Sequence, residues 1–141
     1  MFVLDSDIYS HLIHEHPRVV ARMEDAATQS VDVGIAVITK IEILQGRMAA
    51  LLKADTHERF LTAQQKLFST ENALRKIIVI PLDESALRIF DQLLTVRGLK
   101  KIGRADLLIA SIARANDATL VTRNLKHFRP VPHLKLENWV D

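Results

Sequence analysis

Residues 102–113 read IGRADLLIASIA, an apolar stretch of helical length with Asp106 as its only acid. Apolar residues fall on nearly every face of a helix over 104–115, and this pattern predicts a buried helix rather than a surface one. A helix buried all round needs packed neighbours on more than one side. The rest of the chain supplies them as short apolar runs of strand length and amphipathic helical patterns.

These two kinds of segment alternate along the chain. Alternation of short apolar strands with helices is typical of a mostly parallel sheet covered on both faces. We therefore predict an α/β fold of three layers, α/β/α, with a central sheet of four or five strands in a single domain over residues 1–141. The expected strands are 2–4, 33–37, 77–80, 119–121 and, more weakly, 134–136. The expected helices are 8–27 with an interruption at Pro17, then 39–52 and 56–74 as a hairpin, 83–96 and 104–115.

Acidic and amide side chains mark the ends of these segments. Asp5 closes the first strand, Glu42 lies at the start of the helix after the second, and Asp106 starts the helix before the fourth strand. Asn124 follows that fourth strand. Ligands of parallel sheets bind beyond the carboxyl ends of the strands. Three carboxylates and an amide favour a hard cation, so we expect a Mg²⁺ or Mn²⁺ site here.

Each of the four residues also has a structural explanation that needs no metal. Acids in a first helical turn complement the helix dipole, and short polar side chains cap helices and turns. The alternatives are a capping box of Thr39 with Glu42, a dipole contact by Asp106, a cap by Asn124, and a turn formed by Asp5 with Ser6.

Composition further limits the chemistry, location and partners that the protein can have. The chain has no cysteine, which excludes disulfides, thiolate nucleophiles and thiolate-bound zinc, and favours the cytoplasm. No apolar run has the length of a membrane-spanning helix, so no membrane is expected. The net charge is +2, but residues 72–141 hold 12 Lys and Arg against 7 Asp and Glu. Such a basic half fits a polyanion as partner.

The loop Leu4-Asp5-Ser6-Asp7 has a second interpretation. It resembles the nucleophile loop of haloacid dehalogenase-like phosphatases, in which the first Asp is phosphorylated. That family needs a later acidic metal motif after a strand, and LVTRN at 120–124 supplies no paired acids.

Over essentially its full length, the chain resembles PIN-domain proteins of the VapC type, the ribonuclease toxins of toxin-antitoxin pairs. The resemblance rests on the order and spacing of several segments. These are FVLDSD at 2–7, TKIEILQG at 39–46, IGRADLLIASIA at 102–113, LVTRNLKHF at 120–128 and LENWV at 136–140. It implies a PIN-like fold.

The resemblance also assigns roles to individual positions. Asp5 and Asp106 match the principal metal-binding acids, Glu42 the third acid, and Asn124 a fourth position often occupied by Asp. Asp7 stands where the family commonly has Asn. Supporting roles, as partners of the acids or of the phosphate, fall to Ser6, Asp7 and Thr122.

The activity implied is hydrolysis of an RNA phosphodiester by a metal-activated water, with structured RNA such as transfer or ribosomal RNA as substrate. Asp5 and Asp106 are expected to hold the metal, and Glu42 and Asn124 to place waters around it. Phosphate contacts are expected from a basic set flanking Asp106 and Asn124: Lys100, Lys101, Arg104, Arg123 and Lys126.

The same resemblance implies a homodimer and a VapB-type antitoxin whose C-terminal segment covers the active groove and whose N-terminal part binds operator DNA. The helical hairpin at 40–74 is the expected surface for self-association. The competing interpretation is a non-catalytic PIN-like module that binds RNA or protein, with the carboxylates serving as helix caps.

Overall fold

A computed structural model describes all residues, Met1–Asp141. Its centre is a five-stranded sheet in the order β3-β2-β1-β4-β5, in which every neighbouring pair runs parallel. The strands are β1 (Phe2–Leu4), β2 (Val33–Ala36), β3 (Ile78–Ile80), β4 (Thr119–Val121) and β5 (Lys135–Glu137). The predicted α/β sheet is confirmed, including its fifth strand.

Strand order reverses beside β1. The chain moves outward from β1 through β2 to β3, then crosses back to place β4 on the other side of β1. The register aligns the ends of the two central strands, because Leu4 pairs with Val121 across the β1–β4 boundary. Residues that follow β1 and β4 therefore meet at the point where open parallel sheets bind their ligands.

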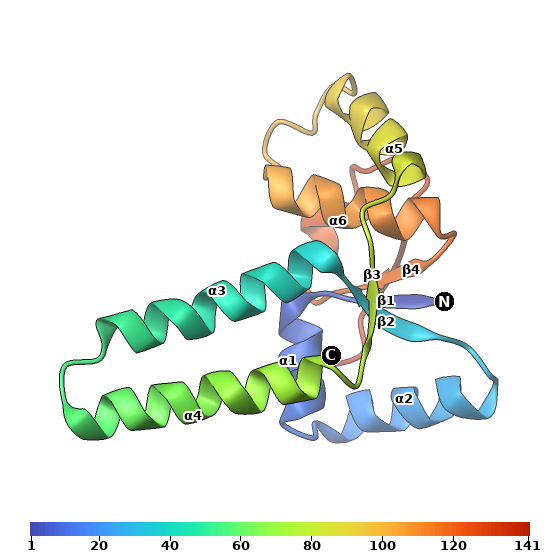
Figure 1. The fold of residues 1–141 in the computed structure, drawn as a ribbon. Helices are drawn as coiled ribbons and strands as arrows, with labels where there is room; N and C mark the ends of the chain where they lie inside the picture. Colours follow the sequence, from blue (N-terminus) through green and yellow to red (C-terminus); the bar gives the residue numbers. More distant parts are fainter.

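Helices cover both faces of this sheet, as Figure 1 shows. Helices α5 and α6 pack on one face over a core that includes Val3 and Leu120, and α1, α2 and the end of α4 pack on the other over Leu4 and Val121. Alternating residues of each strand thus serve the two cores. The helices are α1 (Ser6–Ile13), α2 (Pro17–Thr28), α3 (Val37–Lys53), α4 (His57–Leu74), α5 (Glu84–Leu94), α6 (Arg104–Ala115) and α7 (Leu125–Phe128).

The predicted buried helix is α6. Six of its residues are buried, and its bounds are those predicted from the sequence. Helix α6 lies between the sheet and α5, which is why apolar residues occupy several of its faces. Its first turn, which carries Asp106, consequently points to a fixed place beside the sheet.

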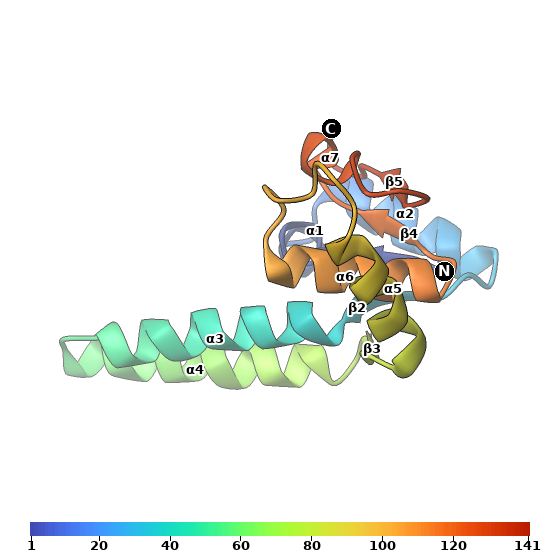
Figure 2. The same cartoon turned by 90° about the horizontal axis from the view of Figure 1, so that it is seen from above.

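Helices α3 and α4 form an antiparallel hairpin that extends well beyond the sheet, as Figure 2 shows from above. The predicted hairpin is confirmed. Because its outer part projects away from the core, large apolar side chains remain exposed along it: Ile41, Met48, Leu52, Phe60, Leu61 and Phe68.

Two local features differ from the sequence-based expectation. Helix α3 begins at Val37, after Ala36 as its N-cap, so Thr39 is a buried residue of the first turn and the capping box of Thr39 with Glu42 is not formed. The one-turn helix α7 was not predicted as a helix, because four residues are too few to show a period. No helix of the chain has both the length and the apolarity that crossing a membrane requires.

Two glycines allow a matched test of this packing. A Cβ on Gly34 in β2 would lie 2.7 Å from the backbone oxygen of Ile78 in β3, whereas one on Gly46 in α3 would meet nothing within 4 Å. We expect Gly34→Ala to lower the free energy of unfolding by about 1–3 kcal/mol, because strand backbone must shift. Gly46→Ala should raise it by about 0.5–1 kcal/mol through helix propensity. Urea unfolding of the two variants measures both, and equal effects would contradict the close β2–β3 approach.

Candidate active site

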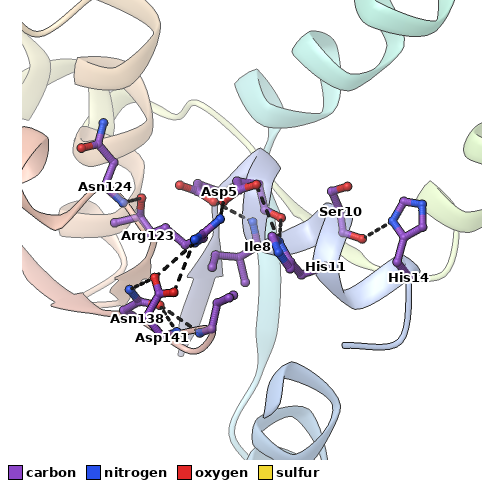
Figure 3. A network of polar contacts seen from close by, with 12 residues as sticks. Asp5, Ile8, Ser10, His11, His14, Arg123, Asn124, Asn138 and Asp141 are labelled. Carbon is purple, nitrogen blue, oxygen red and sulfur yellow. Dashed lines mark hydrogen bonds and ion pairs between the residues drawn. The ribbon is translucent and has the colours of Figure 1, made fainter. Parts of the chain in front are cut away.

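Asp5 is the residue immediately after β1 and the N-cap of α1. Its Oδ1 accepts a hydrogen bond of 2.9 Å from the backbone N–H of Ile8, and its own N–H donates to the carbonyl of Val121 at 3.0 Å. Burial raises the pKa of the Asp5 carboxyl, against the lowering effect of its hydrogen bonds to Ile8 and Thr122. Asp5 is therefore both a structural cap and a half-buried acid at the strand crossover (Figure 3).

Thr122 links Asp5 to the segment that follows β4. Its side chain is fully buried, lowers the pKa of the Asp5 carboxyl, and accepts a 3.0 Å hydrogen bond from the backbone N–H of Asn124. The supporting role expected of Thr122 stays a prediction. Asn124 contributes only its backbone here. Its carboxamide caps nothing and points away from the Arg123 network in Figure 3.

Glu42 comes to the same region from the second turn of α3. Partial burial raises the pKa of its carboxyl, and the negative charges of Asp106 and Asp5 raise it further. Those charge effects show that the three acids face a common region although they come from β1, α3 and α6. Glu42 makes no side-chain hydrogen bond. It is exposed to solvent and lines a groove of about 710 Å³ between α1, α3 and α4.

Asp106 has a partner that the sequence did not suggest. Its Oδ2 lies 2.7 Å from Nε2 of His127, a residue of α7. The signal was present in LVTRNLKHF, since His127 follows Asn124 by three residues and one helical turn brings such residues to the same side. The resemblance to VapC-type PIN domains assigns the fourth position to Asn124 and gives no role to His127.

The three acids do not form a ready-made metal cage. No group of three His, Asp or Glu side chains that could hold a metal ion occurs in the structure. The expectation that three carboxylates crowd around a single point is therefore wrong for this arrangement. The physical reason is repulsion between like charges: Asp5 turns to Ile8 and Asp106 turns to His127, and each relieves its charge locally.

The other predicted supporting residues lie around this edge. Ser6 begins α1 and lines the groove. Asp7 is exposed, with Oδ2 3.8 Å from Nη1 of Arg123, and its charge also raises the pKa of Asp5. Asp7 thus lies close to Asp5, but its negative charge is partly balanced by Arg123.

Of the predicted phosphate-binding residues, the two arginines contact other side chains and the three lysines do not form ion pairs. Arg123 is already paired, since its Nε lies 3.2 Å from Asp141 and that carboxylate raises the pKa of the Arg123 guanidinium (Figure 3). Arg104 extends over the ring of Phe90, with 5.3 Å between the guanidinium carbon and the ring centroid. The remaining cations have exposed side chains without an ion pair: Lys100, Lys101 and Lys126.

Comparison with known proteins agrees with this fold. The family model described as PIN domain matches residues 2–134. Ribonuclease VapC2 of Rickettsia felis is 30% identical over 141 residues, covering 99% of this chain and 98% of that protein. Ribonuclease VapC1 of Haemophilus influenzae is 24% identical over 140 residues, covering 99% and 98%.

Solved structures give the same result. The chain matches the crystal structure of VapBC2 from Rickettsia felis bound to a DNA fragment from their promoter, with a TM-score of 0.76, 31% identity and 98% of both chains covered. It matches DNA-bound VapBC from Salmonella typhimurium with a TM-score of 0.78 at 23% identity, covering 98% and 97%, which supports the fold.

The chain has a parallel sheet with acids at the strand crossover, and the PIN-domain model matches most of its length. It is therefore a PIN-domain protein. Within that family the chain belongs to the VapC ribonuclease toxins. The haloacid dehalogenase interpretation of the Asp5 loop is thereby replaced.

The raised pKa of Asp5 makes a prediction for the metal-free protein. A carboxyl with a raised folded pKa adds stability below its unfolded value of 3.8, and that stability is lost as the pH rises through the folded pKa. At pH 7 Asp5 therefore lowers stability. We expect Asp5→Asn, which keeps a capping oxygen, to raise the melting temperature in chelator at pH 7, with the gain fading toward pH 4.

Asp83 supplies the matched control. It is the N-cap of α5 and accepts a 2.9 Å hydrogen bond from Ala86, but its side chain is exposed. Asp83→Asn should give no gain at pH 7, because only its helix-dipole interaction is lost. Equal shifts for the two variants in differential scanning calorimetry would show that burial of Asp5 carries no electrostatic cost.

Proposed function

We propose that the chain is a divalent-metal-dependent endoribonuclease that cleaves structured RNA at the edge formed by Asp5, Glu42 and Asp106. The observation that carries this proposal is geometric: Asp5 follows β1 at the strand crossover, and Glu42 in α3 and Asp106 in the first turn of α6 lie close enough for the charges of Asp5 and Asp106 to raise the pKa of Glu42. Like charges gathered on a half-buried edge are stabilised by a cation. The ribonuclease names of the full-length relatives supply the reaction class.

The residues present fit Mg²⁺ or Mn²⁺. Their donors are carboxylate oxygens, which these ions prefer, and the chain has no cysteine that would favour a softer metal. Asp5 and Asp106 would hold the ion, because each has a second oxygen beyond the one that accepts the Ile8 or His127 contact. One or two carboxylates suffice for Mg²⁺, which keeps several waters. When bound, the ion supplies an activated water and neutralises charge on the phosphate.

The chain's own residues would divide the remaining work. The Asp5 backbone and side-chain bonds hold its carboxyl in place, so it need not reorganise during the reaction. Glu42 is the acid without a hydrogen-bond partner, and its raised pKa makes its carboxylate a stronger base. Glu42 would act as the general base that accepts the proton of the attacking water. Asn124 would contact waters or substrate through its exposed carboxamide.

Basic residues beside the edge would bind the RNA backbone. Lys100, Lys101 and Arg104 precede or begin α6, and Lys126 lies in α7 next to His127. Such contacts supply salt-dependent affinity without sequence choice. Arg123 joins this set when a phosphate replaces Asp141. Specificity for transfer or ribosomal RNA would come from RNA shape and unpaired bases.

We further propose a VapB-type antitoxin as partner, a homodimer as the assembled form, one domain over 1–141 and the cytoplasm as the location. Support comes from the match to the crystal structure of VapBC2 from Rickettsia felis bound to a DNA fragment from their promoter. The exposed large apolar side chains of the α3–α4 hairpin support self-association, because such side chains are commonly buried where two proteins meet.

Cleavage assays test the enzyme. Total RNA incubated with the wild-type chain and Mn²⁺ should yield fragments with 5′-phosphate and 3′-hydroxyl ends, and chelator should stop the reaction. Asp106→Asn should lower the rate at least about 100-fold, since it removes a charge that no neighbour replaces. Intact RNA that is nevertheless bound would favour the non-catalytic module. Products with 2′,3′-cyclic phosphate would contradict a water nucleophile.

Light scattering tests the dimer. We expect the wild-type mass to be that of two chains, and the double change Leu52→Asp with Leu61→Asp to give one chain, because 81% and 67% of these side chains are exposed in the single chain. The control is Leu87→Asp on α5, whose side chain is 42% exposed outside the hairpin. A wild-type chain that is monomeric at all concentrations would contradict the dimer. Dissociation by Leu87→Asp alone would show that the hairpin is not the dimer surface.

A further inference from the structure

His127 makes the shortest side-chain contact of the acidic edge that the reaction scheme above leaves unused. Its Nε2 lies 2.7 Å from Oδ2 of Asp106, with the two side chains 25% and 38% exposed. The residues come from different helices, α7 and α6, and are separated by 21 positions. A contact between separate elements at a partly buried site restricts both side chains.

The short helix α7 holds the imidazole in position. The backbone N–H of His127 donates to the carbonyl of Asn124 at 3.1 Å, and the next residue, Phe128, is buried in the larger core. The two rings pack edge to face with 5.1 Å between their centroids. His127 is therefore fixed from the core side, and its Nε2 is directed at Asp106 alone.

Asn124 shows the contrast. Its carboxamide makes no hydrogen bond, is exposed, and is turned away from the neighbouring polar network (Figure 3). The backbone of Asn124 supports α7, but its side chain reaches neither Asp5 nor Asp106 in the hydrogen bonds of the structure. The backbone of Asn124 thus forms the turn that leads into α7, and the side chain of His127 contacts Asp106.

We propose that His127, and not Asn124, is the fourth residue of the metal site, and that it acts as a positioning residue for Asp106. By donating from Nε2 to Oδ2, it fixes the carboxylate so that Oδ1 remains for the divalent ion. This inference rests on the proposed metal-dependent function. It deepens that function by assigning a role to a residue that the sequence pattern left out.

An imidazole suits this position for an electrostatic reason. Asp5, Glu42 and Asp106 already oppose one another, so a fourth carboxylate beside Asp106 would add repulsion in the metal-free protein. An imidazole N–H donor holds the carboxylate without adding a negative charge. Hydrogen-bonded partners of metal-binding side chains are commonly worth 10- to 100-fold in metal affinity.

Mn²⁺ binding to the full chain, followed by the electron-spin resonance signal of the free ion, tests this without any turnover. We expect His127→Ala to raise the Kd for Mn²⁺ about 10- to 100-fold. His127→Gln, whose amide N–H can donate to Asp106, should recover much of the affinity. Asn124→Ala and the control Arg129→Ala, at the C-cap of α7, should change the Kd less than threefold. Circular dichroism melting in chelator shows that each variant is folded.

The outcomes separate the claims. Equal Kd values for wild type and His127→Ala overturn the inference, as does a loss in Asn124→Ala as large as that in His127→Ala. A loss in His127→Ala that His127→Gln does not reduce at all contradicts the donor role. Should His127→Ala fail to fold, His127→Leu, which fills the space but cannot donate, takes its place: it must bind Mn²⁺ more weakly than His127→Gln, and equal Kd values for these two variants overturn the inference. A wild-type chain that binds no Mn²⁺ overturns the proposed metal site itself, and this inference with it.

Discussion

The pairing of β1 between β2 and β4 is the constraint on which the site depends. Because β1 is hydrogen-bonded on both sides, the position of its last residue is fixed, and the ladder continues one step further as Asp5 donates to Val121. Thr122 follows Val121 and reaches back to the Asp5 carboxyl. The most buried acid of the edge is thus set by backbone geometry at the strand crossover rather than by a flexible loop.

Three acids on one edge oppose folding unless each charge is relieved, and the chain relieves them unequally. Asp5 has a backbone N–H and a hydroxyl, and Asp106 has an imidazole, whereas Glu42 has no side-chain partner. The raised pKa values of Asp5 and Glu42 record the energetic cost that remains. A residual cost of this kind is expected where a site is organised for a ligand rather than for stability.

The sequence predicted the architecture well because its signals are local: apolar runs mark the strands, and α6 is apolar on several faces. It did not predict α7, whose four residues show no period, nor the His127–Asp106 contact. It overestimated the clustering of carboxylates, because residue order reveals which ends of strands meet but not how each side chain turns to relieve its charge.

The C-terminal segment adds a last constraint on how RNA can approach the edge. Asp141 pairs with Arg123 and also accepts from Asn138, so the chain supplies its own anion to a cation beside the site. The Arg123–Asp141 pair is solvent-exposed, and exposed ion pairs contribute little in water. A polyanion that presents several phosphates to Lys100, Lys101 and Lys126 can therefore displace Asp141 from Arg123 at small cost, because the released carboxylate is rehydrated. In the proposed function, Arg123 would therefore contact RNA after the other cations have bound it, and its contribution would depend on theirs.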